Sequence, residues 1–158
     1  MPSLRETLDA HGLSAKKSFG QHFLLDLNVT RKIVRYAGPF DGRAVIEVGP
    51  GPGGLTRALL ESDAGKVVLV EKDPRFIPLL NELDDGAGRL TVVEADALNV
   101  REDQLVEGPA HLVSNLPYNV GTPLLIKWLT GPWTPCALTL MFQKEVAERV
   151  VAQPGEDA

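Results

Sequence analysis

The chain is poor in cysteine, aromatic residues and long apolar runs, and each scarcity excludes a class of protein. Its single cysteine, Cys136, cannot form an internal disulfide, and the three scattered histidines do not form a zinc-type pair. No apolar run approaches the ~20 residues that a membrane span needs. Residues 1–10 also lack the apolar core of a secretory signal. We therefore expect a cytoplasmic protein with no metal and no membrane partner.

Charge is distributed unevenly along the chain. The net charge of −5 argues against general binding to nucleic acid. Residues 1–40, however, carry six basic and three acidic side chains, a net of +3, while the remainder carries ten basic and eighteen acidic ones, a net of −8. A basic arm beside an acidic body is compatible with one edge that faces RNA, and a solvated amphipathic segment is the alternative. We divide the chain into this arm with its helices (1–40) and a main domain (41–158).

Strand-like and helical patterns alternate through the main domain. Apolar, β-branched runs predict strands at 44–48, 66–71, 90–94, 111–114 and 137–142. Helical patterns are expected at 4–11, 26–37, 55–62, 75–83, 123–129 and 144–152. A chain of 158 residues is about one domain. The alternation predicts an α/β fold with a mostly parallel sheet, in which ligands bind beyond the carboxyl ends of the strands.

Three predicted strands end in groups that suit an adenosine-bearing ligand. The first leads into Glu47-Val48-Gly49-Pro50-Gly51-Pro52-Gly53-Gly54, whose glycines let the backbone turn tightly and approach a ligand. This segment lacks the Lys-Ser/Thr ending of a P-loop. Glu71 ends the second strand, where a carboxylate can accept hydrogen bonds from both hydroxyls of a ribose. Asp96 follows the third strand and could accept a hydrogen bond from the exocyclic amine of an adenine.

The fourth predicted strand is followed by Asn115-Leu116-Pro117-Tyr118, which we expect to form a loop. The oxygen of Asn115 can accept a hydrogen bond from a nucleobase amine, and Pro117, with its fixed φ, can aim nearby carbonyls. Tyr118 can stack on a base, which is worth roughly 1–3 kcal/mol. An ordinary turn uses the same residue types. Because four consecutive strand ends carry suitable groups, we favour a binding site. His111, at the start of a buried strand, is expected to be structural.

These motifs resemble those of the bacterial small-subunit rRNA adenine N6,N6-dimethyltransferase family. The resemblance rests on segments 17–24, 47–53, 94–97, 115–119 and 143–149, and extends from about residue 16 to 154. It implies a Rossmann-like class I methyltransferase fold with a mostly parallel, twisted sheet and S-adenosylmethionine as cofactor. The cofactor contacts that it implies are Gln21, His22, Leu24, Gly49, Gly51, Glu71, Asp96 and Asn115.

The resemblance also implies the reaction. Methyl groups would pass from S-adenosylmethionine to N6 of two adjacent adenosines in the 3′-terminal hairpin loop of 16S rRNA, in the small ribosomal subunit or its precursor. Asn115 and the Leu116 or Pro117 carbonyl would accept hydrogen bonds from the amine, and Tyr118 would stack on the flipped adenine. We expect a monomer. Family members continue well past residue 158, so we expect a chain truncated at its C-terminus, with impaired methylation.

Three alternatives remain open at this point. The related large-subunit rRNA adenine methyltransferases of macrolide resistance share the Asn-Leu/Ile-Pro-Tyr loop, although 20–23 and 119–123 look more like the small-subunit enzymes. A non-catalytic ribosome-assembly factor could use the same fold as a scaffold. A nicotinamide dehydrogenase would share the glycines and Glu71, but it would not account for Asn115-Leu116-Pro117-Tyr118.

Overall fold

The computed structural model describes residues 3, 6, 10, 26–116 and 118–142. The elements are α2 (Leu27–Ala37), β1 (Ala44–Val48), α3 (Gly54–Leu60), β2 (Lys66–Glu71), α4 (Ile77–Asn81), β3 (Leu90–Glu94), the short 3₁₀ helices η3 (Ala97–Asn99) and η4 (Glu102–Gln104), β4 (Ala110–Leu116), α5 (Tyr118–Thr130) and β5 (Ala137–Phe142). No helix in this part of the chain is both long and apolar enough to cross a membrane.

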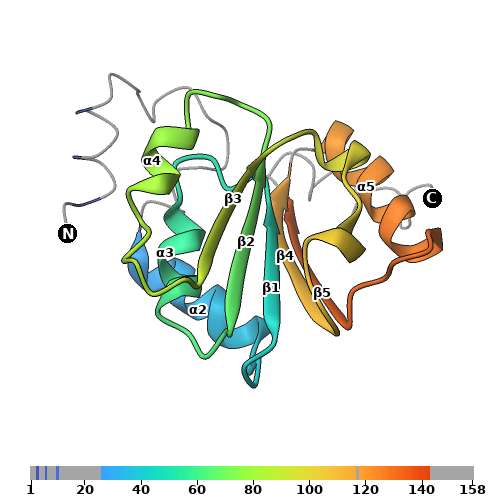
Figure 1. Ribbon diagram of the computed structural model, residues 1–158, viewed down its shortest axis with the longest axis horizontal. Coiled ribbons are helices and arrows are strands. Elements are labelled where there is room, and N and C mark those ends of the chain that lie inside the picture. Colours follow the sequence, from blue (N-terminus) through green and yellow to red (C-terminus); the bar gives the residue numbers. More distant parts are fainter. Residues whose placement is uncertain (1–2, 4–5, 7–9, 11–25, 117, 143–158) are drawn as a thin grey trace, which may run out of the picture.

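The five strands form one parallel sheet in the order β3-β2-β1-β4-β5. Helices α2, α3 and α4 cover one face of the sheet, and α5 with the 3₁₀ helices covers the other (Figure 1). Parallel strands covered on both faces read as continuous apolar runs, as in the Lys-Val-Val-Leu-Val-Glu sequence of β2. The predicted α/β fold with its mostly parallel sheet is therefore confirmed.

Each face of the sheet has its own hydrophobic core because side chains alternate along a strand. Within β2, Val67 and Leu69 join the core beneath α2 and α3, whereas Val68 and Val70 join the core beneath α5. Two side chains of α5, Leu124 and Trp128, are completely buried in the second core. His111 is buried near the amino end of β4, with its ring edge-on to the Phe40 ring and the two ring centroids 4.9 Å apart, in agreement with a structural role.

The helices begin and end somewhat differently from the prediction. The cap of α2 is confirmed, because the Asp26 carboxylate accepts a hydrogen bond from the Asn28 N–H at 2.9 Å. Helix α4 is shorter than expected, since turns rather than a helix cover Pro74–Phe76. The two 3₁₀ helices were not expected from the sequence. The helices expected at 4–11 and 144–152 fall almost wholly outside the described residues.

The expected loop after the fourth strand was wrong in its boundaries. Strand β4 continues through Asn115 and Leu116, which pair with Met141 and Phe142 of β5, and α5 already begins at Tyr118. Pairing with β5 extends β4 beyond its apolar run. Pro123 lies inside α5 and removes one backbone donor, but burial of the α5 side chains outweighs that local cost. Tertiary contacts thus override the local turn signal.

Candidate functional site

A cavity of about 140 Å³ lies at the carboxyl ends of the strands. It is lined by Gly49 after β1, Glu71 at the end of β2 and Asp96 after β3, together with Leu116 at the end of β4. The parallel registers place these ends at one edge of the sheet, although up to about 70 residues separate them in the sequence. The structure therefore brings three of the predicted site residues together.

The glycine-rich turn is held tightly against this edge. Gly49, Gly51 and Gly53 have φ values of +69°, +56° and +94°, which disfavour any other residue. A Cβ on Gly53 would also come within 2.9 Å of Leu83 Cδ1. The Gly49 N–H donates to the Val70 carbonyl of β2 at 2.9 Å, so the start of the turn is fixed to the neighbouring strand.

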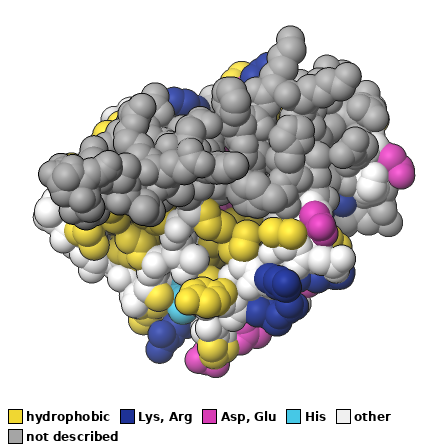
Figure 2. Space-filling model, turned by 180° about the vertical axis from the view of Figure 1, so that it is seen from behind, with side chains coloured by type: hydrophobic (Ala, Val, Ile, Leu, Met, Phe, Trp, Pro, Cys, Tyr) yellow, Lys and Arg dark blue, Asp and Glu magenta, His cyan; other side chains and the backbone are white. Residues whose placement is uncertain are grey.

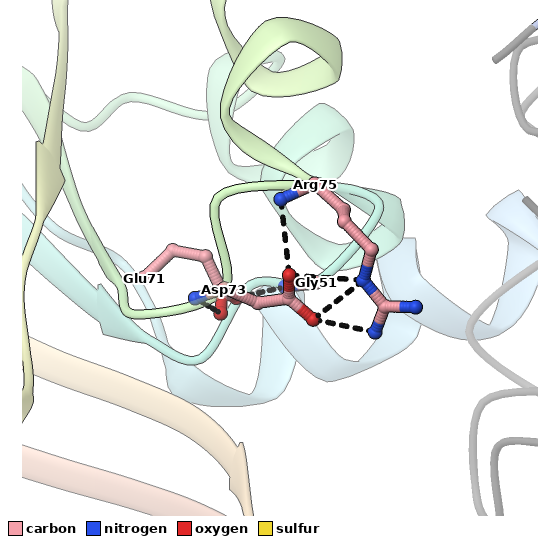
Figure 3. Close-up of polar contacts among 4 residues, drawn as sticks. All are labelled: Gly51, Glu71, Asp73 and Arg75. Atoms are coloured by element: carbon pink, nitrogen blue, oxygen red, sulfur yellow. Dashed lines mark hydrogen bonds and ion pairs between the residues drawn. The ribbon is translucent and has the colours of Figure 1, made fainter.

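Glu71 joins this turn to the end of β2 (Figure 3). Its side chain is 6% exposed, and its two oxygens accept hydrogen bonds from the Gly51 N–H at 2.8 Å and the Asp73 N–H at 2.9 Å. Asp73 in turn binds the Arg75 guanidinium at 2.7 Å. Burial raises the pKa of Glu71, and backbone hydrogen bonds, chiefly those from Asp73 and Gly51, oppose that rise. Each carboxylate oxygen keeps a second lone pair, which leaves acceptor capacity for a ligand hydroxyl.

Asp96 lines the same cavity as Glu71 but is exposed. Its Oδ1 accepts a hydrogen bond from the Leu98 N–H at 3.0 Å and so caps η3. Among the described residues, its other oxygen, Oδ2, accepts no hydrogen bond. One oxygen thus orients the side chain while the other remains available as an acceptor.

Asn115 has a buried side-chain oxygen that lacks a partner among the described residues. The strand that carries it is fixed in place, because the adjacent Ser114 hydroxyl donates to the Val48 carbonyl of β1 at 2.5 Å. A buried polar atom left unpaired costs about 1–3 kcal/mol, so a native structure usually supplies a reason for it. A donor on a bound ligand is such a reason.

The remaining predicted site residues are not placed. Gln21, His22, Leu24 and Pro117 lie outside the described residues, and of Tyr118 only the backbone is described, at the first position of α5. Their roles stay predictions. The described residues contain no group of three His, Cys, Asp or Glu side chains that could hold a metal ion.

Glu47 is an ionisable residue beside this site to which the sequence motifs assigned no role. It is 2% exposed, and the Thr56 hydroxyl of α3 donates to its Oε1 at 2.6 Å. Burial raises the pKa of Glu47 to about 8, the Thr56 hydrogen bond opposes the rise, and the charge of Glu71 adds to it. The sequence does carry a signal, since Glu47 is the one acidic residue within the apolar strand Ala-Val-Ile-Glu-Val.

A second unforeseen cluster anchors α5. The Lys127 ammonium donates to the Ala97 carbonyl at 2.7 Å, to the Val100 carbonyl at 2.8 Å and to Glu102 Oε2 at 2.8 Å. The Trp128 indole N–H donates to the same Glu102 oxygen at 3.0 Å. Because Ala97 follows Asp96 and α5 follows β4, this cluster joins two segments that border the cavity. No local pattern reveals it, since its partners are about 25 residues apart.

Comparison with known proteins gives a consistent match. The family model described as "Ribosomal RNA adenine dimethylase" matches residues 12–158. A "Ribosomal RNA small subunit methyltransferase A" from Phenylobacterium zucineum is 72% identical over all of this chain and 55% of its own length. The protein of the same name from Caulobacter vibrioides is 69% identical over 91% of this chain and 56% of its own length. The chain thus spans about half the length of the curated relatives it matches.

The similar solved structures include two at 30% identity or more. A dimethyladenosine transferase from Plasmodium falciparum has a TM-score of 0.63 and 34% identity, over 80% of this chain and 45% of its own. The 23S rRNA methyltransferase ErmE has a TM-score of 0.64 and 30% identity, over 78% of this chain and 48% of its own.

Proposed function

The chain belongs to the ribosomal RNA adenine dimethylase family, and from that premise we propose that it binds S-adenosylmethionine and methylates adenosine N6 in rRNA. The expected substrate is a pair of adjacent adenosines near the 3′ end of 16S rRNA, in the small ribosomal subunit or its precursor. The observation that carries the proposal is the meeting of Gly49, Glu71 and Asp96 at one cavity, beside a strand whose Asn115 oxygen has no partner among the described residues.

The residues around the cavity suit the cofactor. Glu71 would accept hydrogen bonds from the ribose hydroxyls with its remaining lone pairs, and Asp96 Oδ2 would accept one from the adenine amine. The cavity of about 140 Å³ is smaller than the ~300–1,000 Å³ of typical ligand pockets. It would therefore enclose one ring of the cofactor, with the rest extending over the exposed Gly49. When bound, S-adenosylmethionine supplies an electrophilic methyl group on a sulfonium.

Asn115 would act on the substrate amine. The lone pair of an adenine N6 is delocalised into the ring, so the amine is a weak nucleophile. By accepting a hydrogen bond at Oδ1, Asn115 would favour a tetrahedral nitrogen and orient its lone pair. The buried position of Oδ1 strengthens this hydrogen bond, because water does not compete for the acceptor. Leu116, the next residue, lines the cavity, so the end of β4 that carries Asn115 borders the cofactor site.

Substitution of Asn115 tests the proposal. We expect Asn115→Ala to bind S-adenosylmethionine with nearly unchanged affinity, measured by calorimetry, while methyl transfer to 16S rRNA falls by about 100-fold, the typical effect of one transition-state hydrogen bond. Asn81→Ala, a change of an exposed asparagine in α4, is the matched control and should keep the activity of the unsubstituted chain. Unchanged transfer by Asn115→Ala would remove Asn115 from the mechanism, and binding of NAD in place of S-adenosylmethionine would overturn the whole proposal.

The similarity to a 23S rRNA methyltransferase supports a second candidate, methylation of the large-subunit RNA. The chemistry at Asn115 would be the same, and only the RNA would differ. Assays with separated ribosomal subunits distinguish the two, since we expect label from the cofactor in 16S rRNA and none in 23S rRNA.

A further inference from the structure

Helix α2 has two faces of opposite character. Its inner face packs on α3 through Val34, with Ile33 and Ala37 beside it. Its outer face consists of five exposed residues, namely Asn28, Arg31, Lys32, Arg35 and Tyr36. With 3.6 residues per turn these five positions fall within one sector of the helix, which we call the α2 strip.

The α2 strip is basic in a chain whose net charge is −5. It contains three basic and no acidic side chains. Arg31 forms an ion pair with Glu61 of α3 at 2.8 Å, so its charge is partly neutralised. Lys32 and Arg35 have no acidic partner within the described part of the chain. Seen from behind, the molecule shows Lys and Arg side chains gathered on one part of its surface (Figure 2).

An aromatic ring completes the strip. Tyr36 is 89% exposed and lies one helical turn after Lys32. A single exposed aromatic residue is unremarkable, and a row of charges is usually a solvated face. Cations without an acidic partner among the described residues, combined with an exposed ring, are however the composition of surfaces that bind single-stranded nucleic acid, where bases stack on the ring.

The α2 strip lies close enough to the cavity to contact the same RNA. Helix α3 begins at Gly54, directly after the glycine-rich turn, and the Arg31–Glu61 ion pair fixes α2 to the other end of α3. The seven residues of α3 span about 10 Å at 1.5 Å per residue. Lys32, Arg35 and Tyr36 follow Arg31 toward the start of β1, at the opposite end of the strands from the cavity, so the strip would contact nucleotides more than about 10 Å from the base at the cavity.

We propose that the α2 strip binds the sugar–phosphate backbone of the substrate RNA outside the catalytic cavity. Lys32 and Arg35 neutralise phosphates, and Tyr36 stacks on an unpaired base. This inference rests on the proposed function, because it takes rRNA as the substrate. The strip positions the RNA and does not take part in methyl transfer, so it affects RNA affinity and not cofactor binding.

The test measures binding of a fluorescent RNA hairpin with the 16S rRNA 3′-terminal sequence, by anisotropy at several salt concentrations. Each lost phosphate contact lowers the slope of log K against log salt by about 0.7–0.9. We therefore expect Lys32→Ala/Arg35→Ala to lower the slope by about 1.5 and to weaken binding at least fivefold at physiological salt (order of magnitude). Tyr36→Ala should weaken binding about fivefold or more, and Tyr36→Phe should preserve it.

Arg101→Ala is the matched control, because Arg101 is an exposed basic residue beside η4, on the opposite face of the sheet. It should leave affinity and slope unchanged. Equal losses in the Arg101 variant, wild-type binding by the α2 variants, or no salt-dependent binding by the unsubstituted chain would each overturn the inference. Calorimetry with S-adenosylmethionine distinguishes failure of this inference from failure of the proposed function. A chain that does not bind the cofactor contradicts the proposed function. A chain that binds the cofactor, with α2 variants that bind RNA like the wild type, contradicts only the present inference.

Discussion

Replacing Glu47 by glutamine should remove a large part of the pH dependence of folding. Glu47 is buried, and its pKa in the folded chain is about 8, against an ordinary value of 4.5. Between these two pH values the folded chain keeps a proton on Glu47 that the unfolded chain releases. The stability contributed by the protonated group is complete below pH 4.5 and is lost as the pH rises through about 8.

The size of the effect follows from this interval. One pKa unit corresponds to about 1.4 kcal/mol, so Glu47 should lower the free energy of unfolding by about 3–4 kcal/mol between pH 5 and pH 8. Glutamine cannot ionise, and its amide oxygen can still accept the Thr56 hydrogen bond seen at 2.6 Å. We therefore expect Glu47→Gln to gain stability over the wild type as the pH rises, by about that amount.

Urea unfolding at four pH values from 5 to 8 measures this prediction. Glu94→Gln, which changes an exposed glutamate at the end of β3, is the control and should follow the wild type. Parallel curves for the Glu47 variant and the wild type would refute the assignment of a neutral carboxyl to β1. A neutral Glu47 also has a consequence for the site, because it removes one negative charge from the neighbourhood of Glu71.

Two further predictions concern the site and its support. Glu71→Gln places an amide N–H₂ against the N–H of Gly51 or Asp73, so the affinity for S-adenosylmethionine, measured by calorimetry, should fall about tenfold or more. The control Glu94→Gln should leave this affinity unchanged. Equal affinities of the Glu71 variant and the unsubstituted chain would contradict the ribose role. Lys127→Met leaves the buried Glu102 carboxylate with one donor, so the free energy of unfolding in urea should fall by about 2–4 kcal/mol. Breaking the exposed Arg101–Asp103 ion pair should cost less than about 1 kcal/mol. Similar losses in both variants would show that the Lys127 cluster does not anchor α5.

Much of the fold could be predicted because it rests on local pattern. The five strands are apolar runs rich in β-branched residues, and their spacing leaves room for crossover helices. Parallel topology then places all strand carboxyl ends at one edge, which is why Gly49, Glu71 and Asp96 could be grouped before their positions were known. The Asp26 cap of α2 was also readable, since a capping side chain acts on a donor two residues away.

Other features depend on contacts between distant segments, and only the tertiary structure decided them. Pairing with β5 extends β4 through Asn115, and that burial leaves the Asn115 oxygen without a partner among the described residues. The protonation of Glu47 depends on the helix and strands packed around it, since burial sets its pKa. The sequence by itself therefore determined which residue types lie at the carboxyl ends of the strands, because the alternation of strands and helices along the chain sets their placement. The tertiary structure decided where β4 ends, whether Glu47 is protonated and which acceptor lacks a hydrogen-bond partner among the described residues. These features depend on neighbours in space that the order of residues along the chain does not reveal.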